Sequence, residues 1–185
     1  MQMGKLEVID TPLEGVKLIK AFRADDVRGT FVKPADSELL QEIGFGVREI
    51  FLSVNRKNVI RGLHYIEPGP QRRIVFCIQG EILDVAADIR PSSPNFGKWH
   101  AEALTGKNCT GMLVPRGFAH GFMSLSDESI VLYLADEKHV PENDRGIRYD
   151  DPDIGIKWPL GSSQPIMSKR DLGFPTLKKA AELME

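Results

Sequence analysis

Eight short segments that favour β-strands constrain the fold of this sequence most strongly. Each is five to ten residues long, is rich in β-branched and aromatic side chains, and is bounded by Gly, Pro, Asn or Asp. They are residues 14–22, 47–54, 58–66, 72–79, 81–90, 98–104, 111–115 and 129–136. So many strands at such close spacing predict a mainly β protein, either a sandwich, a jelly roll or a closed barrel. Turn-forming residues at 79–80 and 105–108 predict hairpins there.

Helical patterns are confined to two places. Residues 36–44 combine a capping Asp or Ser with apolar Leu39, Leu40 and Ile43, and Gly44 ends the pattern. Residues 175–185 predict an amphipathic C-terminal helix. Between the last strand and that helix, residues 137–174 are proline-rich and show little periodicity. We therefore expect them to form a long ordered flap over the barrel.

Length and composition indicate one ordinary globular domain over residues 1–185. The net charge of −2 gives no reason to expect binding to nucleic acid or to an anionic membrane. The sequence contains neither an apolar run of about 20 residues nor a signal-peptide core at its start, so we expect a cytoplasmic protein. Cys77 and Cys109 lack the spacing of metal ligands, and Cys77 lies in an apolar run typical of a buried core.

Two of the four histidines, His64 and His120, are candidates for chemistry. A lone histidine in a strand is more often a hydrogen-bonded structural residue than a catalyst. However, both occur beside glycines that allow close backbone approach, in "RGLHY" and "PRGFAHGF", and both have arginines nearby.

The segment 81–90 alternates between two faces of different polarity. One face is wholly apolar, whereas the other carries Asp84 and Asp88 among small or apolar residues. Such faces suit a barrel whose interior holds a polar ligand, although a sheet with one solvated face would give the same pattern. The apolar face comprises Leu83, Val85, Ala87 and Ile89, and the other comprises Ile82, Asp84, Ala86 and Asp88.

The sequence contains the second motif of the cupin barrels, P-x-G-x-x-H, as Pro115, Gly117 and His120. The first motif of metal-binding cupins requires a second histidine two residues after the first, because several ligands must converge on the ion. Here His64 is followed by Tyr65 and Ile66. We therefore predict no metal site.

Six motifs in order along the chain resemble the nucleotide-sugar 3,5-epimerases that act on dTDP-4-dehydro-6-deoxyglucose in dTDP-rhamnose synthesis. The resemblance runs from about residue 8 to residue 175 and implies a cupin-type double-stranded β-helix (jelly roll) with short flanking helices. It also implies an isomerase that works as a homodimer on a nucleoside-diphosphate sugar, with no metal and no other cofactor. The motifs are "KNVIRGLHY", "GEILDVAADIR", "SPNFGKW", "VPRGFAHGF", "LSDESIVLY" and "DPDIGIKWP".

The reaction of that family explains the residue types. Protons on C3 and C5 flank the C4 carbonyl, so a base can remove them to give an enolate, and inversion needs an acid on the opposite face of the ring. The resemblance implies that His64 is the base, Asp171 orients it, and Tyr133 is the acid. It assigns Arg73 to the position of the family's lysine near the keto oxygen.

The resemblance also assigns residues to substrate binding. Arg61 corresponds to an arginine that binds the pyrophosphate, and Arg28 to another that reaches a site with help from the neighbouring subunit. His120 corresponds to a histidine that lines the same pocket. Strict alternation would put Arg61 and His64 on opposite faces of a strand. Either a bulge at Gly62 re-aims one side chain, or Arg61 acts from the rim of the site.

Several recognition positions depart from the family pattern. Lys33 follows Phe31 of the "RG-x-F" motif where the family has a glutamate, and Ile66 replaces a glutamine. Glu49, Phe51 and His139 replace a glutamine, an asparagine and a nucleotide-stacking tyrosine. Retained catalytic positions with altered recognition positions suggest the same enolisation on a different, non-dTDP sugar nucleotide, or epimerisation at a single carbon.

Two classes of protein outside this family share the barrel motif. A non-catalytic cupin that binds a sugar nucleotide would need the histidine and the acid to be incidental, and the presence of Tyr133 argues against it. A metal-dependent cupin oxygenase or isomerase would need metal ligands that this sequence lacks. Both therefore fit the sequence less well than an epimerase.

Overall fold

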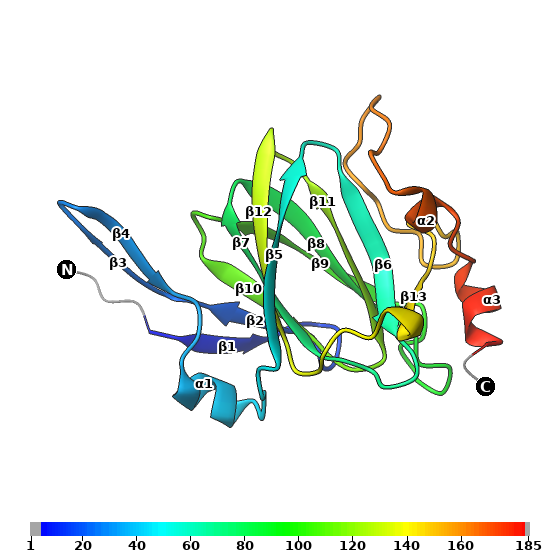
Figure 1. The fold of residues 1–185 in the computed structure, drawn as a ribbon, viewed down its shortest axis with the longest axis horizontal. Helices are drawn as coiled ribbons and strands as arrows, with labels where there is room; N and C mark the ends of the chain where they lie inside the picture. Colours follow the sequence, from blue (N-terminus) through cyan, green and yellow to red (C-terminus); the bar gives the residue numbers. More distant parts are fainter. Residues whose placement is uncertain (1–4, 184–185) are drawn as a thin grey trace.

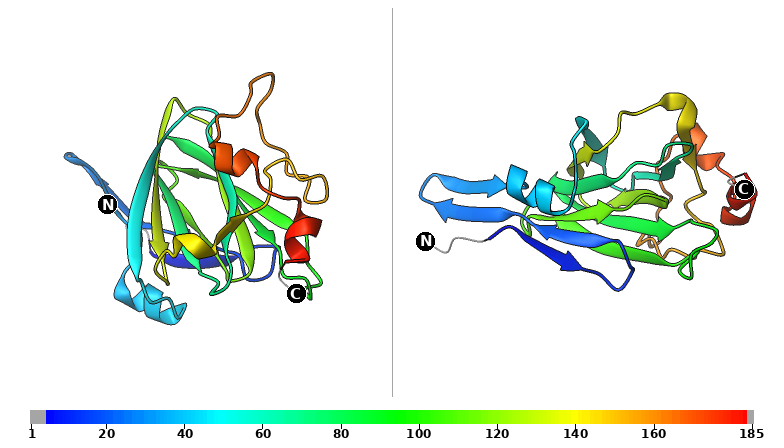
Figure 2. Two further views of the ribbon diagram at one scale, coloured as in Figure 1. Left: turned by 45° about the vertical axis from the view of Figure 1, so that its right-hand side comes forward. Right: turned by 90° about the horizontal axis from the view of Figure 1, so that it is seen from below.

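The computed structural model describes residues 5–183, which form two antiparallel sheets packed face to face, a separate hairpin and short helices (Figures 1 and 2). The six-stranded sheet has the order β1-β2-β10-β7-β12-β5, and the five-stranded sheet has the order β13-β6-β11-β8-β9. The strands of the first sheet are β1 (Glu7–Asp10), β2 (Lys17–Lys20), β5 (Glu49–Arg56), β7 (Arg73–Gln79), β10 (Thr110–Val114) and β12 (Glu128–Ala135). Those of the second are β6 (Ile60–Ile66), β8 (Glu81–Asp88), β9 (Trp99–Thr105), β11 (Phe118–Ser124) and β13 (Asp144–Gly146).

The chain crosses from one sheet to the other repeatedly, which makes the two sheets a jelly roll. Strands β5, β7, β10 and β12 belong to one sheet, whereas β6, β8, β9 and β11 belong to the other. The predicted fold class is therefore confirmed. The predicted hairpins at 79–80 and 105–108 are wrong, because these turns join strands of opposite sheets. A turn motif specifies that the chain reverses, but not which sheet receives the next strand.

The largest difference from the predicted strands is β11, which was expected only as a motif beside a turn. All seven of its residues are buried, and it lies between β6 and β8 in the sheet. A strand buried on both faces shows no alternation of polar and apolar residues, so periodicity cannot reveal it. The segment 14–22 was also expected as one strand. It comprises β2 and the first residue of β3 (Phe22–Asp26), which forms a projecting hairpin with β4 (Gly29–Lys33) (Figure 1).

Short helices flank the sheets. Helix α1 (Ser37–Glu42) begins where predicted, and the Asp36 side chain accepts a hydrogen bond from the Leu39 amide at 3.0 Å. The C-terminal helix α3 (Leu177–Ala181) is shorter than predicted, and residues 184–185 of that prediction lie outside the described residues. The expected flap contains η1 (Pro141–Asn143), β13 and helix α2 (Lys169–Leu172). No helix within residues 5–183 is long and apolar enough to cross a membrane.

Strand β8 has apolar packing on both faces, which excludes a sheet with one solvated face. Ile82 and Ala86 face the core between the sheets, where they join Val75, Met112 and Phe122. On the other side the flap and α3 cover the five-stranded sheet. The cluster there comprises Leu63, Tyr65, Val85, Ala87, Ile89, Ala119, Ile147, Ile154, Ile156, Leu177 and Ala180. Asp84 therefore faces the barrel interior, where it is fully buried.

A β-bulge at Gly62 puts Arg61 and His64 on the same face of β6. Arg61 pairs with Phe122 and His64 with His120, so β6 advances three residues while β11 advances two. Gly62 has a φ of +124°, and a Cβ there would lie 2.6 Å from the Cα of Gly121. Only glycine fits this backbone approach. The bulge resolves the conflict between strict alternation and a shared site.

We expect Gly62→Ala to destabilise the protein by about 2 kcal/mol or more, because the methyl group meets backbone and the positive φ is strained. Urea unfolding monitored by circular dichroism would measure the change. Gly46→Ala is the matched control, since a Cβ at Gly46 meets nothing within 4 Å and no positive φ is needed there. Equal unfolding midpoints for the two variants would contradict a steric requirement at the bulge.

Candidate active site

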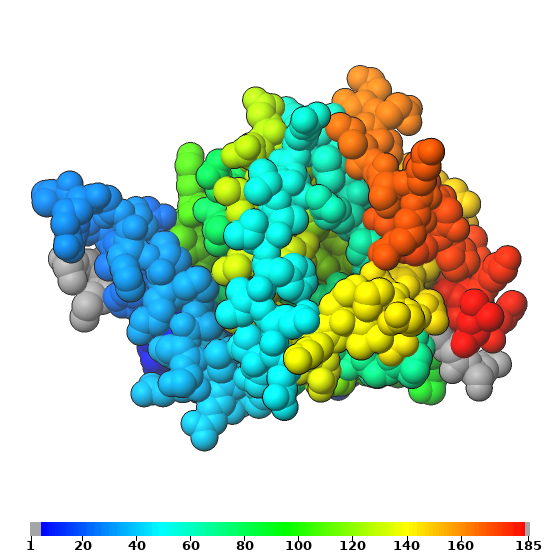
Figure 3. Space-filling model, viewed as in Figure 1, coloured from blue at the N-terminus to red at the C-terminus, as the bar shows by residue number. Residues whose placement is uncertain are grey.

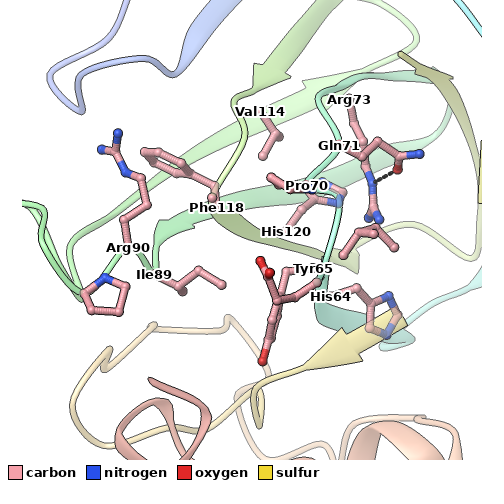
Figure 4. Close-up of a pocket in the computed structure, with 14 residues that line it drawn as sticks. His64, Tyr65, Pro70, Gln71, Arg73, Ile89, Arg90, Val114, Phe118 and His120 are labelled. Atoms are coloured by element: carbon pink, nitrogen blue, oxygen red, sulfur yellow. Dashed lines mark hydrogen bonds between the residues drawn. The ribbon is translucent and has the colours of Figure 1, made fainter. Parts of the chain in front are cut away.

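The candidate site is a cavity of about 270 Å³ in the open seam between β5 and β6, the facing strands of the two sheets. A hollow is visible there between the cyan atoms of β5 and the neighbouring strand (Figure 3). A second cavity of about 170 Å³ continues from it and shares His64, Gln71, Arg73 and His120 (Figure 4). The first cavity is lined by Phe51, Ser53, Arg61, His64, Gln71, Arg73, His120, Phe122, Tyr133, His139 and Asp144.

His64 and Asp171 form a hydrogen-bonded pair at the edge of the cavity. The Nε2 atom of His64 lies 3.0 Å from Oδ2 of Asp171, which belongs to α2 in the C-terminal flap. The carboxylate also accepts a hydrogen bond from the Gly62 amide at 3.1 Å and one from the Ser168 hydroxyl at 2.8 Å. Three donors therefore hold the carboxylate, and the carboxylate holds the imidazole.

The surroundings of Asp171 keep it ionised. Burial by itself raises its pKa, but the hydrogen bond and charge of His64, the Gly62 amide and Ser168 outweigh burial and lower the pKa to about 2. With Nε2 donating to this carboxylate, Nδ1 is the ring nitrogen of His64 that can accept a proton. The pair thus has the geometry of a general base with an orienting carboxylate.

Tyr133 enters the same cavity from β12 and is almost fully buried. Its ring stacks on Phe51 at 4.7 Å, and the ring of His120 meets it edge-on at 6.1 Å. Burial, and then the Asp84 carboxylate, raise the pKa of Tyr133 well above its usual range, while Arg73 and Arg61 oppose that shift. The phenol is therefore protonated at neutral pH and is able to act as an acid.

His120 and Asp84 make a second buried pair inside the barrel. The Nε2 atom of His120 lies 2.8 Å from Oδ1 of Asp84, and both side chains are at most 4% exposed. Burial raises the pKa of Asp84, against the charge and hydrogen bond of His120. The strand pairing sets this arrangement, because His120 lies opposite both His64 on β6 and Ala86 on β8.

Two arginines supply positive charge to the cavity. Arg61 Nε donates to Asn55 Oδ1 at 2.8 Å, and Arg73 Nε donates to Gln71 Oε1 at 2.8 Å. Burial lowers the pKa of Arg73, although Tyr133 and Asp144 oppose this shift. A guanidinium group still carries its charge at neutral pH. Arg73 therefore brings a partly desolvated cation to the cavity that Tyr133 and His64 share.

The remaining predicted residues divide into two sets. Glu49 and His139 meet near the mouth of the cavity, where the Glu49 carboxylate accepts a hydrogen bond from the His139 amide at 3.0 Å. In contrast, Arg28, Phe31 and Lys33 lie on the projecting β3–β4 hairpin, and none of them lines this cavity (Figure 1). Arg28 pairs with Asp26, and Lys33 lies 3.5 Å from Asp36.

Sequence reasoning missed several residues of the cavity wall. Alternation had identified Asp84 as facing inward, but not its pairing with His120. The same alternation along β5 would have grouped Phe51 with Ser53 and Asn55 on the inner face. Gln71 lies in the loop before β7 and gives no periodic signal. No group of three or more His, Cys, Asp or Glu side chains in the described part of the chain is arranged to hold a metal ion.

Comparison with known proteins identifies the family of this chain. Residues 10–179 match the family model described as dTDP-4-dehydrorhamnose 3,5-epimerase. The chain is 40% identical over 180 residues to the dTDP-4-dehydrorhamnose 3,5-epimerase of Methanothermobacter thermautotrophicus. The alignment covers 96% of this chain and 97% of that protein.

Two solved structures are similar over nearly their whole length. One is the dTDP-6-deoxy-D-glucose-3,5-epimerase RmlC of Legionella pneumophila in complex with dTDP-4-keto-L-rhamnose, with 35% identity, a TM-score of 0.92 and 97% of each chain covered. The other is ChmJ, a 3'-monoepimerase of Streptomyces bikiniensis in complex with dTDP-quinovose, with 30% identity and a TM-score of 0.88. That alignment covers 95% of this chain and 90% of ChmJ.

The fold and these relatives are those of a cupin-type sugar-nucleotide epimerase, an isomerase. The chain belongs to the dTDP-4-dehydrorhamnose 3,5-epimerase family.

The low pKa of Asp171 predicts a loss of stability in acid. Its folded-state pKa of about 2 lies below the ordinary value of 3.8, so its contribution is present above pH 3.8 and is lost as the pH falls towards 2. The shift corresponds to about 2 kcal/mol. Urea unfolding at pH 6 and pH 2 should therefore show a smaller loss of unfolding free energy in acid for Asp171→Asn than for the wild type.

The control is Asp127→Asn at an exposed position, whose loss of unfolding free energy in acid should match that of the wild type. The same acid loss in Asp171→Asn would contradict the assignment.

Proposed function

We propose that this protein inverts the configuration at C3, at C5, or at both carbons of a nucleotide-linked 4-keto-6-deoxy sugar. His64 is the base, Asp171 orients it, and Tyr133 is the acid. The supporting observation is that a histidine paired to an ionised carboxylate and a protonated tyrosine enter one cavity from opposite sheets. Two groups on different sides of a bound ring are what inversion requires.

The chemistry follows from these groups. Nδ1 of His64 takes a proton from the carbon beside the carbonyl, and the electron pair of the broken C–H bond moves to the carbonyl oxygen as an enolate. The enolate then collapses back to the ketone as the carbon takes the proton of Tyr133 on its opposite face. The imidazole is left protonated and the phenol ionised until both exchange with solvent. Arg73 is the cation that stabilises the enolate oxygen.

Substrate binding is proposed to use both subunits of a homodimer. Arg61 holds the diphosphate from within the chain, and Arg28 reaches the site of the neighbouring subunit together with Phe31 and Lys33. The projecting hairpin supports this arrangement, because it carries Arg28 and an exposed Phe31 away from its own cavity. A continuous apolar surface on β5 is also available for subunit contact. Its members are Ile50, Leu52 and Val54, each more than half exposed.

The specificity for the nucleotide, and for the carbon atom that is inverted, is determined by Lys33, Glu49, Phe51 and His139. Glu49 is engaged with the His139 backbone, and Phe51 presents an aromatic ring instead of a hydrogen-bonding group. A nucleobase that needs amide partners would lose about 1–3 kcal/mol of binding free energy for each buried polar group left unpaired. We therefore propose that a non-dTDP sugar nucleotide, or inversion at one carbon only, suits this site better than the substrate named for the family. Both kinds of enzyme occur among the similar structures, a 3'-monoepimerase at 30% identity and a 3,5-epimerase at 35% identity, so the single-carbon alternative rests on the altered residues.

The experiment that tests this function is a panel of dTDP-, UDP-, GDP- and CDP-linked 4-keto sugars in deuterated water, read by NMR. We expect His64→Asn to lose deuterium exchange at every carbon by about 10²–10⁴-fold, because no enolate forms without the base. Tyr133→Phe should still exchange, with retained configuration, while net inversion is lost. Wild-type inversion by Tyr133→Phe would show that another group is the acid. Absence of exchange by the wild type on every member of the panel would overturn the proposed function.

The proposed dimer makes a separate prediction about shared sites. Sedimentation at micromolar concentration should give a dimer, and mixing inactive Arg28→Ala subunits with inactive His64→Asn subunits should restore activity. One site of such a mixed dimer has both an intact base and an intact hairpin. An active monomer, or a mixture that stays inactive after subunit exchange, would count against the shared site.

A further inference from the structure

The two arginines of the cavity differ from other arginines of this chain in the group that holds their Nε atom. In Arg61 and Arg73 that group is a neutral side-chain amide, Asn55 and Gln71 respectively. Nε of Arg116 also donates to a neutral group, the Pro70 carbonyl, but its Nη1 pairs with Asp136 at 2.8 Å. In five arginines that do not line the first cavity Nε donates to an aspartate, and these are Arg23, Arg28, Arg72, Arg90 and Arg148. Arg61 and Arg73 have no carboxylate oxygen within 4.0 Å among residues 5–183.

The amide of Asn55 has only one orientation that satisfies its neighbours. Asn55 is 2% exposed, and its Nδ2 lies 3.1 Å from the Ser53 hydroxyl, 3.2 Å from the Ser53 carbonyl and 3.3 Å from the Ser129 carbonyl. All three neighbours accept a hydrogen bond, so the NH₂ group faces them and Oδ1 faces Arg61. The guanidinium of Arg61 is thereby held at a fixed place on the wall of the cavity.

Gln71 holds Arg73 in an equivalent way from the loop before β7. Its Nε2 donates to the Glu137 carbonyl at 2.6 Å, which leaves Oε1 to accept from Arg73 Nε (Figure 4). Glu137 closely follows β12, the strand that carries Tyr133. The acidic residue that lines the cavity, Asp144, is paired with Arg170 at 2.9 Å.

An amide and a carboxylate have different effects on a guanidinium group. Both can accept the Nε hydrogen and set the direction of the planar fork, but only the carboxylate cancels the charge. With an amide at Nε, the four Nη hydrogens and the full positive charge stay available to a ligand. A ligand that benefits from this arrangement is an anion.

We propose that Asn55 and Gln71 are positioning residues that aim Arg61 and Arg73 at the anionic parts of the substrate without neutralising them. Arg61 receives the diphosphate, and Arg73 receives the oxygen that becomes negative in the enolate. This inference rests on the proposed function and adds to it the reason why the two partners are amides.

The test separates charge from orientation by comparing an acid with an alanine at each position. Gln71→Glu keeps the hydrogen-bond acceptor but adds a negative charge, so kcat should fall about 10- to 100-fold with KM little changed. Gln71→Ala should lower kcat by a smaller factor. Asn55→Asp should weaken the binding of dTDP, UDP and inorganic pyrophosphate about 10- to 100-fold in calorimetry, and Asn55→Ala should weaken it less. Arg61→Ala is measured in parallel with the same probes.

The matched control is Asn95→Asp, which adds the same charge beside Lys98 on a loop outside the cavity and should leave both readouts unchanged. Thermal unfolding of each variant checks the fold. If Asn55→Asp does not fold, Asn55→Ala still tests orientation at Arg61, and Gln71→Glu compared with Gln71→Ala still separates charge from orientation. Both Gln71 variants are expected to fold, because Gln71 is only partly buried in a loop.

The failures of the two proposals are distinguishable. If Arg61→Ala binds the three probes as well as the wild type, or the wild type binds none, the diphosphate role in the proposed function is wrong, and the role of Asn55 falls with it. If Arg61→Ala weakens binding but Asn55→Asp does not, the inference about Asn55 alone is overturned. Alanine variants as impaired as the acidic ones would show that only orientation matters and would overturn the charge argument.

Discussion

The site depends on one close backbone contact, that of Gly62 on β6 with Gly121 on β11. A Cβ on Gly121 would lie 2.7 Å from the Arg61 carbonyl, so the requirement for glycine is mutual. The contact allows the bulge, and the bulge turns Arg61 to the same side as His64. It also directs the Gly62 amide at the Asp171 carboxylate. One local irregularity in a regular sheet thus positions the Arg61 guanidinium and the His64 imidazole, and it provides one of the donors that hold the Asp171 carboxylate.

The protonation states of the proposed base and acid come from opposite kinds of surroundings. Asp171 is buried but receives three hydrogen-bond donors, so its ionised form is favoured and His64 is held ready to accept a proton. Tyr133 is buried beside a carboxylate, so its neutral form is favoured. An ionised Asp171 and a neutral Tyr133 are the states that the proposed mechanism needs.

Sequence patterns predicted a mainly β protein and most strands, because eight segments carried a local β signal, and the family resemblance then implied the jelly roll. They could not predict β11, whose residues are buried on both faces, nor the sheet that each strand joins after a turn. Resemblance singled out His64, Tyr133 and Asp171, but the contact between residues 64 and 171 is a long-range property of the flap. Asn55 and Gln71 were missed because a side-chain amide that holds an arginine has no sequence signature, and its role appears only when its partner is known.

The electrostatics of the cavity follow from which charges the chain leaves unpaired. With a net charge of −2, this chain has carboxylates to spare, and several arginines that do not line the cavity pair with them. Around the cavity the carboxylates of Asp84 and Asp171 pair with histidines, and Asp144, which lines it, pairs with Arg170. Arg61 and Arg73 are left with amides and therefore bring positive charge to the cavity that His64 and Tyr133 also line. A low-dielectric cavity that contains uncompensated cations binds an anionic ligand strongly and stabilises a reaction in which negative charge develops on oxygen. In the proposed mechanism the same two arginines both retain the nucleoside-diphosphate sugar and lower the barrier to its enolate.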